Sequence, residues 1–302
     1  MKIHKRANRS SIEYVSPKLL ATAIGVSESS LKRWTDEGRL EAERTAGGHR
    51  RIAVGEAVRF VRNAGLRVIR PELLGLARAS GTSHAQDDRE TATERLLAAL
   101  ESDGAAEARS LIVSLYMEGA SPGWICDVPI RQALERIGEL WEHGAGGIFL
   151  EHRATETCLQ ALGELRLILP APPGDAPVAL GGGSEGEVYV LPSLMAATVV
   201  AEAGFEVRNL GADTPTVALL EAIRHYEPQL VWISYSVPPR NPREAVTGLA
   251  RLADALNGGS LVVGGRGSDG LPLPWSPAVH RIETMSELAA FARGLSAPGG
   301  RG

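Results

Sequence analysis

The feature that most constrains the fold of this chain is a regular alternation of short apolar runs and amphipathic stretches from Pro177 onward. The apolar runs have the length of buried strands, and the stretches between them repeat apolar residues at helical spacing. Short buried strands that alternate with amphipathic helices are typical of a parallel sheet with helices on both faces. We therefore predict a doubly wound α/β domain at residues 173–296 and a flexible tail at 297–302. The predicted strands comprise residues 178–183, 206–211, 230–236 and 260–265.

The ligand site of such a Rossmann-like sheet is expected beyond the carboxyl ends of its strands. In this chain, that rule points to four loops rather than to any one residue. These loops comprise residues 183–191, 210–215, 234–236 and 264–267.

The charge of the chain is unevenly distributed. The net charge is -4, but the first 70 residues hold 15 Lys and Arg against 7 Asp and Glu, which leaves 17 against 29 in the remainder. A basic first quarter on an acidic body indicates a nucleic-acid-binding head joined to a regulatory module. Double-stranded DNA is the partner that this distribution favours.

The basic region, residues 1–72, has the spacing of a helix-turn-helix. Ser16 is placed to cap a first helix that Gly25 ends, and Ser27 is placed to cap a second helix that reaches Glu37. Two short helices around such a turn place the second in the DNA groove. The side chains that this second helix offers to DNA are Ser29, Ser30, Lys32 and Arg33.

A short hairpin is predicted after these helices, because Gly47 and Gly48 make a tight turn between two extended pieces. Basic side chains clustered beside a helix-turn-helix usually meet phosphate. The hairpin therefore adds the DNA-binding candidates Arg44, His49, Arg50 and Arg51.

The middle of the chain, residues 90–172, is predicted to be an antiparallel four-helix bundle, because it contains four helical stretches joined by short breaks. A small and polar stretch at 73–89 is the predicted linker to the head. Cys126 and Cys158 lie in apolar helical patterns without metal-ligand spacing, so we predict buried thiols.

One stretch of the predicted bundle concentrates coordinating and stacking groups. Trp141 ends one helix, glycines at 144–147 break it, and a new helix is predicted to begin near Ile148. Glu151 and His152 then fall in its first turns, where the helix dipole favours a carboxylate. The next helix thus carries a Glu-His pair, and nine residues separate this pair from the Trp.

These stretches resemble the light-dependent, cobalamin-binding repressors of the MerR superfamily. The wing sequence Arg44-Thr45-Ala46-Gly47-Gly48-His49-Arg50 resembles their winged helix-turn-helix, and the Trp and Glu-His spacing resembles their cap over the upper face of the corrin. The strand-end loops resemble the corrinoid domain that these repressors share with methionine synthase and the mutases. The resemblance implies a cofactor site that includes Trp141, Glu151, His152, Ser234, Ser236, Gly264 and Gly265.

The chain departs from this family in the motif that supplies the lower ligand of the cobalt. Where the family has Asp-x-His-x-x-Gly, with the His as lower ligand, this chain has Glu187, Tyr189 and Pro192. A phenol, with an ordinary pKa near ~10, binds metal well only when deprotonated. Glu187 and Tyr189 stay candidates for contact with a cofactor without ligating its metal.

Three hypotheses follow from the missing histidine. Cobalamin is held with its own base, or with no protein group, below the cobalt. Alternatively, the ligand is another tetrapyrrole such as a bilin, with His152 or His143 as a ligand from the bundle side. In the third, no cofactor is bound and a protein partner controls the chain.

An enzyme hypothesis comes from the corrinoid domains of mutases and methyltransferases. Those reactions need a substrate domain facing the cobalt, where this chain has a helical bundle, and they have no use for a DNA-binding head. We therefore predict a transcription regulator, a repressor, rather than an enzyme. It is expected to form a homo-oligomer whose assembly or DNA affinity responds to ligand or light.

The expected location is the cytoplasm. No apolar run is long enough to cross a membrane, and the basic N-terminus is not followed by the apolar core of a signal peptide.

Overall fold

The computed structural model describes residues 14–45, 47–66, 68–74, 91–139 and 145–296. The chain forms two compact units, which are described separately: Met1–Ala79 with Leu167–Pro170, and Ser80–Arg166 with Ala171–Gly302. Most of the predicted linker and all of the predicted tail lie outside the described residues. None of the helices described combines the length and the hydropathy that crossing a membrane requires.

The first unit begins with the two predicted helices. Helix α1 (Pro17–Ile24) starts at Ser16, whose Oγ accepts a hydrogen bond from the backbone N–H of Leu19, and it ends at Gly25. Helix α2 (Glu28–Asp36) is capped in the same way by Ser27. The capping residues predicted for both helices are therefore confirmed.

A small antiparallel sheet completes this unit. Its strands are β1 (Tyr14–Val15), β2 (Glu43–Arg44) and β3 (Arg50–Ala53), in the order β1-β3-β2. Glu43 pairs with Arg51, and Gly48 has a left-handed φ of 79°, so the predicted hairpin is confirmed. Helix α3 (Val54–Asn63) and a 3-10 turn, η1 (Pro71–Leu74), follow.

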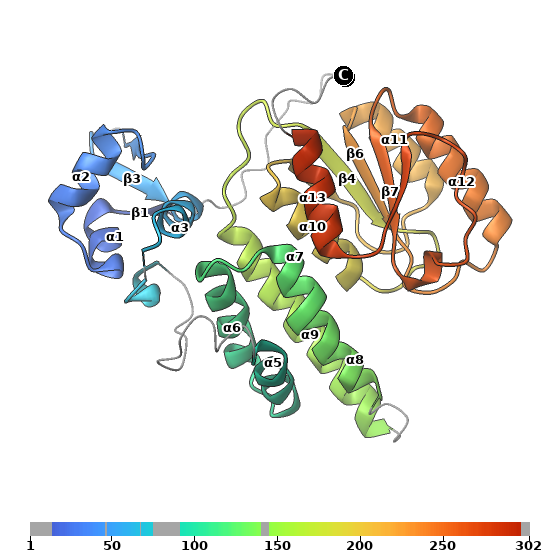
Figure 1. Ribbon diagram of the computed structural model, residues 1–302, viewed down its shortest axis with the longest axis horizontal. Helices are drawn as coiled ribbons and strands as arrows, with labels where there is room; N and C mark the ends of the chain where they lie inside the picture. Colours follow the sequence, from blue (N-terminus) through green and yellow to red (C-terminus); the bar gives the residue numbers. More distant parts are fainter. Residues whose placement is uncertain (1–13, 46, 67, 75–90, 140–144, 297–302) are drawn as a thin grey trace. The chain divides into compact units, whose positions relative to one another are not determined.

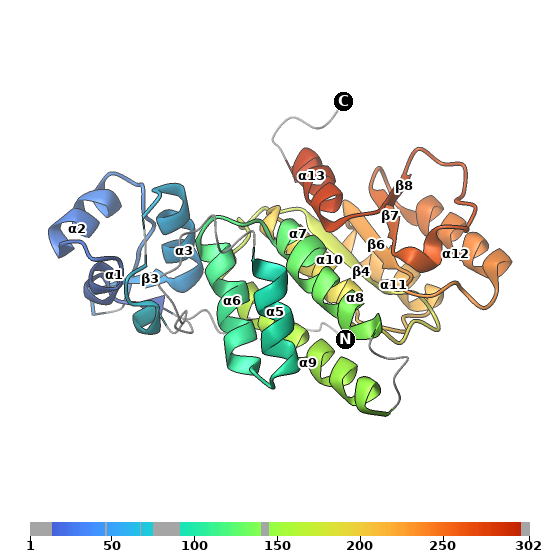
Figure 2. The same cartoon turned by 60° about the horizontal axis from the view of Figure 1, so that its bottom comes forward.

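The second unit begins with a layer of helices, which Figures 1 and 2 show side by side. Helix α5 packs against α6 and α8, and Arg109 of α6 forms an ion pair with Glu164 of α9 at 2.9 Å. The helices of this layer are α5 (Ala92–Glu101), α6 (Ala105–Met117), α7 (Pro122–Ile125), α8 (Arg131–Glu139) and α9 (Ala145–Leu167).

Between α7 and α8 the chain continues as a π-helical segment, η2 (Cys126–Ile130). Pro129 lies inside it and has no N–H to donate, so a regular α-helix would lose a hydrogen bond here. The sequence pattern did not reveal this irregularity.

The predicted break before α9 is wrong in position. The helix begins at Ala145, so Gly146 and Gly147 lie in its first turn instead of outside it. Residues of a first turn have no N–H bonded within the helix, which makes glycine less damaging there than in the interior. Glu151 and His152 consequently lie in the second turn, beyond the strongest influence of the helix dipole.

The predicted parallel sheet is confirmed, with the strand order β5-β4-β6-β7-β8. Every pairing in it is parallel. Its strands are β4 (Val178–Gly183), β5 (Glu206–Asn209), β6 (Leu230–Ser234), β7 (Ser260–Gly264) and β8 (Val279–Ile282). The last strand, β8, was not predicted.

Helices cover both faces of this sheet. On one face, Val231 and Ile233 of β6 pack with α11 (Thr216–Tyr226) and α12 (Pro242–Ala255). On the other, Trp232 lies under α10 (Leu191–Glu202), which packs against α13 (Met285–Ser296). Successive strand residues point to opposite faces, which explains this division.

Two contacts tie the helical layer to the sheet within the second unit. The carboxylate of Asp127 accepts hydrogen bonds from the backbone N–H groups of Met285 and Ser286, both at 2.8 Å, at the start of α13. Arg266, which follows β7, forms an ion pair with Glu135 of α8. The helical layer therefore reaches the carboxyl edge of the sheet.

Candidate functional site

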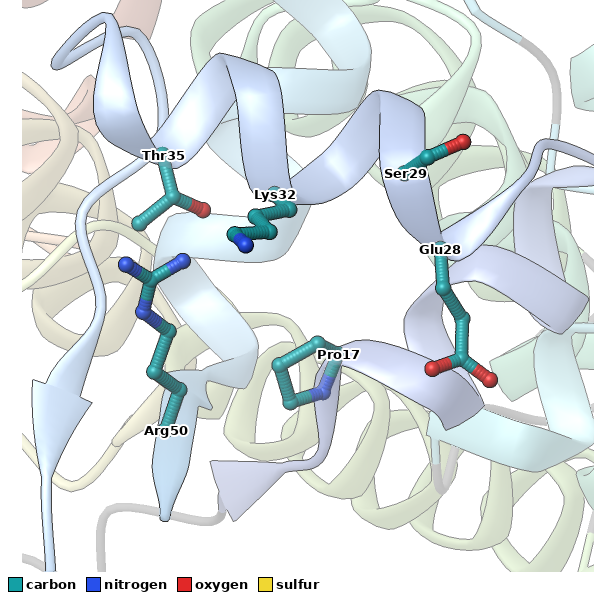
Figure 3. Close-up of a pocket in the computed structure, with 6 residues that line it drawn as sticks. All are labelled: Pro17, Glu28, Ser29, Lys32, Thr35 and Arg50. Atoms are coloured by element: carbon teal, nitrogen blue, oxygen red, sulfur yellow. The ribbon is translucent and has the colours of Figure 1, made fainter. Parts of the chain in front are cut away.

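The head carries an open pocket of about 280 Å³ between α1, α2 and β3. Figure 3 shows Lys32 projecting toward it from α2 and Arg50 from β3. Two groups of DNA-binding candidates, on the second helix and on the hairpin, are thus brought together. The pocket is lined by Pro17, Glu28, Ser29, Lys32, Thr35 and Arg50.

The candidates on α2 differ in their freedom to bind a ligand. The hydroxyls of Ser29 and Ser30 are hydrogen-bonded to the capping hydroxyl of Ser27, at 2.7 and 2.9 Å. The side chain of Lys32 is exposed and makes no hydrogen bond or ion pair with another described residue. Arg33 lies 3.9 Å from Glu37 in an exposed ion pair. Lys32 therefore offers the least encumbered charge on this helix.

The hairpin arginines are held by acidic neighbours. Arg50 forms an ion pair with Asp36 at 2.7 Å, and Arg51 forms one with Glu43 at 2.7 Å. Arg51 also lies over the ring of Tyr14, with its guanidinium carbon 3.9 Å from the ring centroid. Exposed ion pairs contribute at most about 1 kcal/mol, so a phosphate can replace these carboxylates at little cost.

The remaining hairpin candidates lie at its tip. Arg44, at the end of β2, and His49, in the turn, are both exposed. The backbone N–H of His49 donates to Thr45 Oγ1 at 3.2 Å, which fixes the turn.

At the carboxyl edge of the large sheet, the loops singled out from the sequence are joined by backbone hydrogen bonds. Gly183 N–H donates to the carbonyl of Gly211 at 2.7 Å, and Ser184 N–H donates to that of Ser234 at 3.1 Å. Tyr235 N–H donates to the carbonyl of Gly264 at 2.9 Å. The four loops therefore form one connected edge.

Glu187 lies at the centre of this edge, and its side chain is 2% exposed. One carboxylate oxygen accepts a hydrogen bond from Tyr189 N–H at 2.9 Å, and the other accepts one from Ser236 N–H. The carboxylate thereby joins the loop after β4 to the loop after β6.

The loops that meet at this carboxylate carry exposed apolar side chains, which we call the strand-end rim. Large apolar side chains rarely gather in the open without a partner. Among the rim residues, Tyr189 was a predicted contact of the cofactor, and all except Val237 lie in the four loops that the sequence had marked. The rim consists of the exposed side chains of Val188, Tyr189, Val190, Leu210 and Val237.

Ser236 supplies a polar group beside the rim. Its Oγ is buried and, within the part of the chain that the structure describes, has no hydrogen-bond partner. A buried hydroxyl without a partner is costly, so it marks a position where a ligand can form a hydrogen bond. Ser234 Oγ, in contrast, already donates to the carbonyl of Gly182 at 3.4 Å.

The glycine pair Gly264 and Gly265, at the end of β7, lies against the protein's own backbone. Gly265 has a φ of 94°, and a Cβ there would lie 2.2 Å from the carbonyl oxygen of Tyr235. A Cβ on Gly264 would lie 2.9 Å from the carbonyl of Ile282. Both glycines allow close packing of the chain on itself, and their contact with a ligand stays a prediction.

Of the cap residues, Trp141 and His143 lie outside the described residues. Glu151 is half-buried and His152 is exposed on α9. Among the residues that the structure describes, no group of three or more His, Cys, Asp or Glu side chains is placed to hold a metal ion. His152 would therefore serve only as a single ligand to a metal that a cofactor brings with it.

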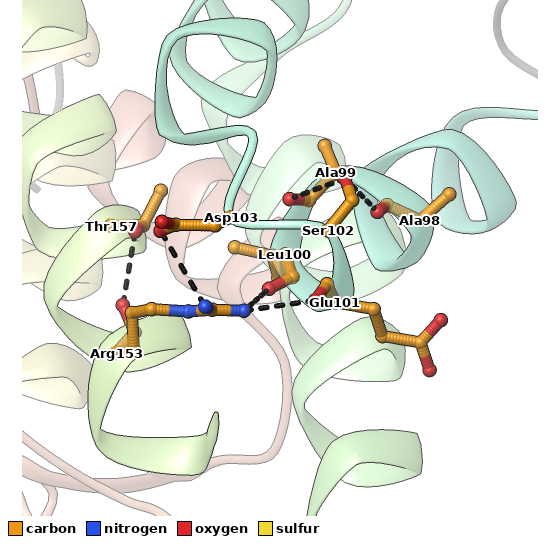
Figure 4. A network of polar contacts seen from close by, with 8 residues as sticks. All are labelled: Ala98, Ala99, Leu100, Glu101, Ser102, Asp103, Arg153 and Thr157. Carbon is orange, nitrogen blue, oxygen red and sulfur yellow. Dashed lines mark hydrogen bonds and ion pairs between the residues drawn. The ribbon is translucent and has the colours of Figure 1, made fainter. Parts of the chain in front are cut away.

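Arg153, which was not predicted from the sequence, joins the first half of α9 to the end of α5. Its guanidinium donates to the carbonyls of Leu100 at 2.7 Å and Glu101 at 2.9 Å, and lies 3.5 Å from Asp103 (Figure 4). These groups end α5, so Arg153 positions the turn that carries Glu151 and His152. The signal in the sequence was a single Arg beside the Glu-His pair, which is too weak to interpret alone.

The two cysteines are buried and unpaired, as predicted. Burial raises the pKa of the Cys158 thiol to about 12 and raises that of Cys126 as well. Both are therefore protonated, unreactive parts of the helical core.

Comparison with known proteins first shows which kind of domain and fold this chain resembles. The family described as "B12 binding domain" matches residues 88–166, whose described part is the helical layer. The monomethylamine corrinoid protein of Methanosarcina barkeri has the same fold over 68% of this chain and 99% of its own, with a TM-score of 0.51 and 16% identity.

Two individual proteins are similar to this chain in sequence. The chain is 27% identical over 290 residues to the HTH-type transcriptional repressor CarA of Myxococcus xanthus, which covers 91% of this chain and 94% of that repressor. It is also 27% identical over 117 residues to dimethylamine corrinoid protein 2 of Methanosarcina mazei, spanning 54% of that protein. The predicted resemblance to repressors that carry a cobalamin-binding region is confirmed.

Proposed function

We propose that this chain is a DNA-binding transcription regulator, a repressor, whose action on DNA is controlled by a cobalamin-type ligand. The observation that carries the proposal is the similarity to a repressor along 91% of the chain. The sequence match to dimethylamine corrinoid protein 2 covers only 37% of the chain, which favours a regulator over a corrinoid enzyme component. We assign residues 1–72 to a winged helix-turn-helix, 90–172 to a four-helix cap and 173–296 to the ligand-binding sheet.

In this proposal, α2 enters the major groove and the β2–β3 hairpin acts as the wing. Lys32, exposed and without an acidic partner among the described residues, contacts a base edge or a phosphate from α2. Arg44 and Arg50 bind phosphates from the wing, with Arg50 exchanging Asp36 for the DNA backbone.

The experiment for the head is selection of a duplex from a random pool, followed by titration at several salt concentrations. Arg44→Ala should weaken binding and lower the slope of log affinity against log salt by about 0.9, because one phosphate contact is lost. Arg251→Ala is the matched control, since it removes an exposed Arg from α12 and leaves the head unchanged. Equal slopes for Arg44→Ala and the unaltered chain would remove the wing from the interface.

The strand-end rim and Ser236 fit the ring of a corrinoid. A macrocycle needs an apolar surface for its face and donors or acceptors for the amide groups at its edge, and both are present. Rim residues would contact the face of the ring, Ser236 Oγ an amide, and Trp141, Glu151 and His152 the opposite side. When bound, an alkylcobalamin supplies absorption of visible light and a cobalt–carbon bond that light can break.

The experiment for the ligand is to supply adenosylcobalamin to the purified chain and measure retention, oligomeric state and duplex affinity in darkness and after illumination. We expect retention of the ligand and a change in subunit number or duplex affinity. Several weakly binding heads in one assembly would gain affinity through effective concentration. If no cobalamin is retained, the same measurements are repeated with a bilin. Retention of the bilin would indicate another tetrapyrrole as the ligand, and no retention would indicate a regulator without a ligand.

A further inference from the structure

The strand that leads to the rim, β4, ends in three consecutive glycines, and the chain's own atoms fill the space around each of them. Glycines at such positions leave room either for a ligand or for the protein itself. The neighbours of Gly181, Gly182 and Gly183 distinguish these two cases.

The space above Gly181 is taken by the indole of Trp232. A Cβ on Gly181 would lie 2.3 Å from an atom of this ring. Trp232 is 2% exposed, and its Nε1 donates to Ser193 Oγ of α10 at 3.2 Å. The indole therefore occupies the layer between β4 and α10.

The end of the same layer is closed by Glu187. Gly183 points to the same face as Gly181, and a Cβ on it would lie 2.7 Å from Glu187 Cγ. On the opposite face, a Cβ on Gly182 would lie 2.8 Å from Thr214 Oγ1. The glycines of β4 thus serve internal packing on both faces of the strand.

We infer that the strand-end site accepts the ring of a corrinoid but not its nucleotide, which gains no buried contact in the sheet. The inference rests on the proposed function. The rim is exposed and apolar, so it can cover the face of a ring. The layer between β4 and α10, which the glycines of β4 would otherwise leave open to an appended group, already holds Trp232 and Glu187. An appendage left in water buries no surface and adds no affinity.

The test compares two probes on the full chain: hydroxocobalamin, and diaquocobinamide, which has the corrin ring without the nucleotide. Equilibrium dialysis gives a Kd for each in darkness. We expect cobinamide to bind at least as tightly as cobalamin, within about threefold. A preference for cobalamin of more than about tenfold would overturn the inference and leave the proposed function intact. Failure of both probes to bind would overturn both the inference and the proposed function.

Two substitutions sharpen the test. Trp232→Ala vacates the layer, so it should shift the ratio of the two Kd values toward cobalamin by at least about tenfold if the nucleotide can then enter. Val188→Ala is the matched control, because it removes apolar surface from the rim and should weaken both probes by the same factor. An unchanged ratio in a folded Trp232→Ala protein would contradict the inference. If this variant does not fold, the comparison on the unaltered chain still decides.

Discussion

The buried carboxylate of Glu187 gives the sharpest quantitative prediction, through the substitution Glu187→Gln. Glutamine has the same length and shape, so the packing against Gly183 is kept. The carboxylate accepts one hydrogen bond from Tyr189 N–H and one from Ser236 N–H. An amide group can accept only one of these and turns its own N–H groups toward the other donor.

The cost follows from these two bonds. A hydrogen bond to a charged acceptor contributes about 1.5–3 kcal/mol, and a buried N–H without a partner costs about 1–3 kcal/mol. Since one of the two bonds survives in weaker form, we expect the loop after β6 to open more easily by about 2 kcal/mol. This difference corresponds to roughly 30-fold faster exchange of the affected amide hydrogen.

Hydrogen exchange measured at single amides tests this value. Ser236 or Tyr189 should exchange faster in Glu187→Gln, whereas Gly183, whose N–H donates to Gly211, should not change. Glu185→Gln is the control, because Glu185 is exposed and lies on the same loop. Unaltered exchange at both Ser236 and Tyr189 would refute the role given to the carboxylate.

Three other changes test separate parts of the second unit. Asp127→Ala should lower the unfolding free energy by about 2 kcal/mol in urea titrations, since the first two backbone N–H groups of α13 lose their acceptor while the Thr284 cap stays, and a smaller loss in Asp127→Asn is expected. Gly265→Ala should destabilise the fold more than Gly270→Ala does, because a Cβ at 265 would lie 2.2 Å from the carbonyl oxygen of Tyr235, whereas a Cβ at 270 meets no atom within 4 Å. Equal midpoints of urea unfolding for the two variants would contradict this. Cys158 has a folded pKa of about 12 against an ordinary 9.0, so its contribution to stability is complete below pH 9.0 and is lost as pH rises toward 12. Cys158→Ala should lose that part of the pH dependence.

Local chemistry made much of the fold readable from the sequence. Ser16, Ser27 and Gly25 act within one helical turn, so their capping roles did not depend on the rest of the molecule. The alternation of apolar strands and amphipathic helices likewise defined the parallel sheet, because burial on both faces imposes its own periodicity. The candidates on α2 and β3 could be named because short spacings placed them on one helix and one hairpin.

Strand β8 and helix α13 were not predicted from the sequence, and the start of α9 was misplaced. Strand β8 is short and only half-buried, so it lacks the apolar run of the central strands. Helix α13 carries a local cap, in which Thr284 Oγ1 accepts from Glu287 N–H at 3.1 Å, and this signal was overlooked in the sequence. The acceptor of its Ser286 N–H, Asp127, lies 159 positions away in the chain and could not be predicted from spacing. The start of α9 was placed too late because glycines that would break a helix interior are tolerated in its first turn.

The sequence by itself determined which side chains are present near the strand ends, and only the tertiary structure decided what they do there. The sequence resemblance marked Glu187 as a possible contact of a cofactor, but folding turns its carboxylate inward to two backbone donors. Trp232 read as one more apolar residue of a buried strand, yet its indole fills the layer beside Gly181. Both roles arise from groups that are distant in the chain and meet only when the parallel strands are aligned, because spacing along the chain does not specify which neighbour a buried side chain meets.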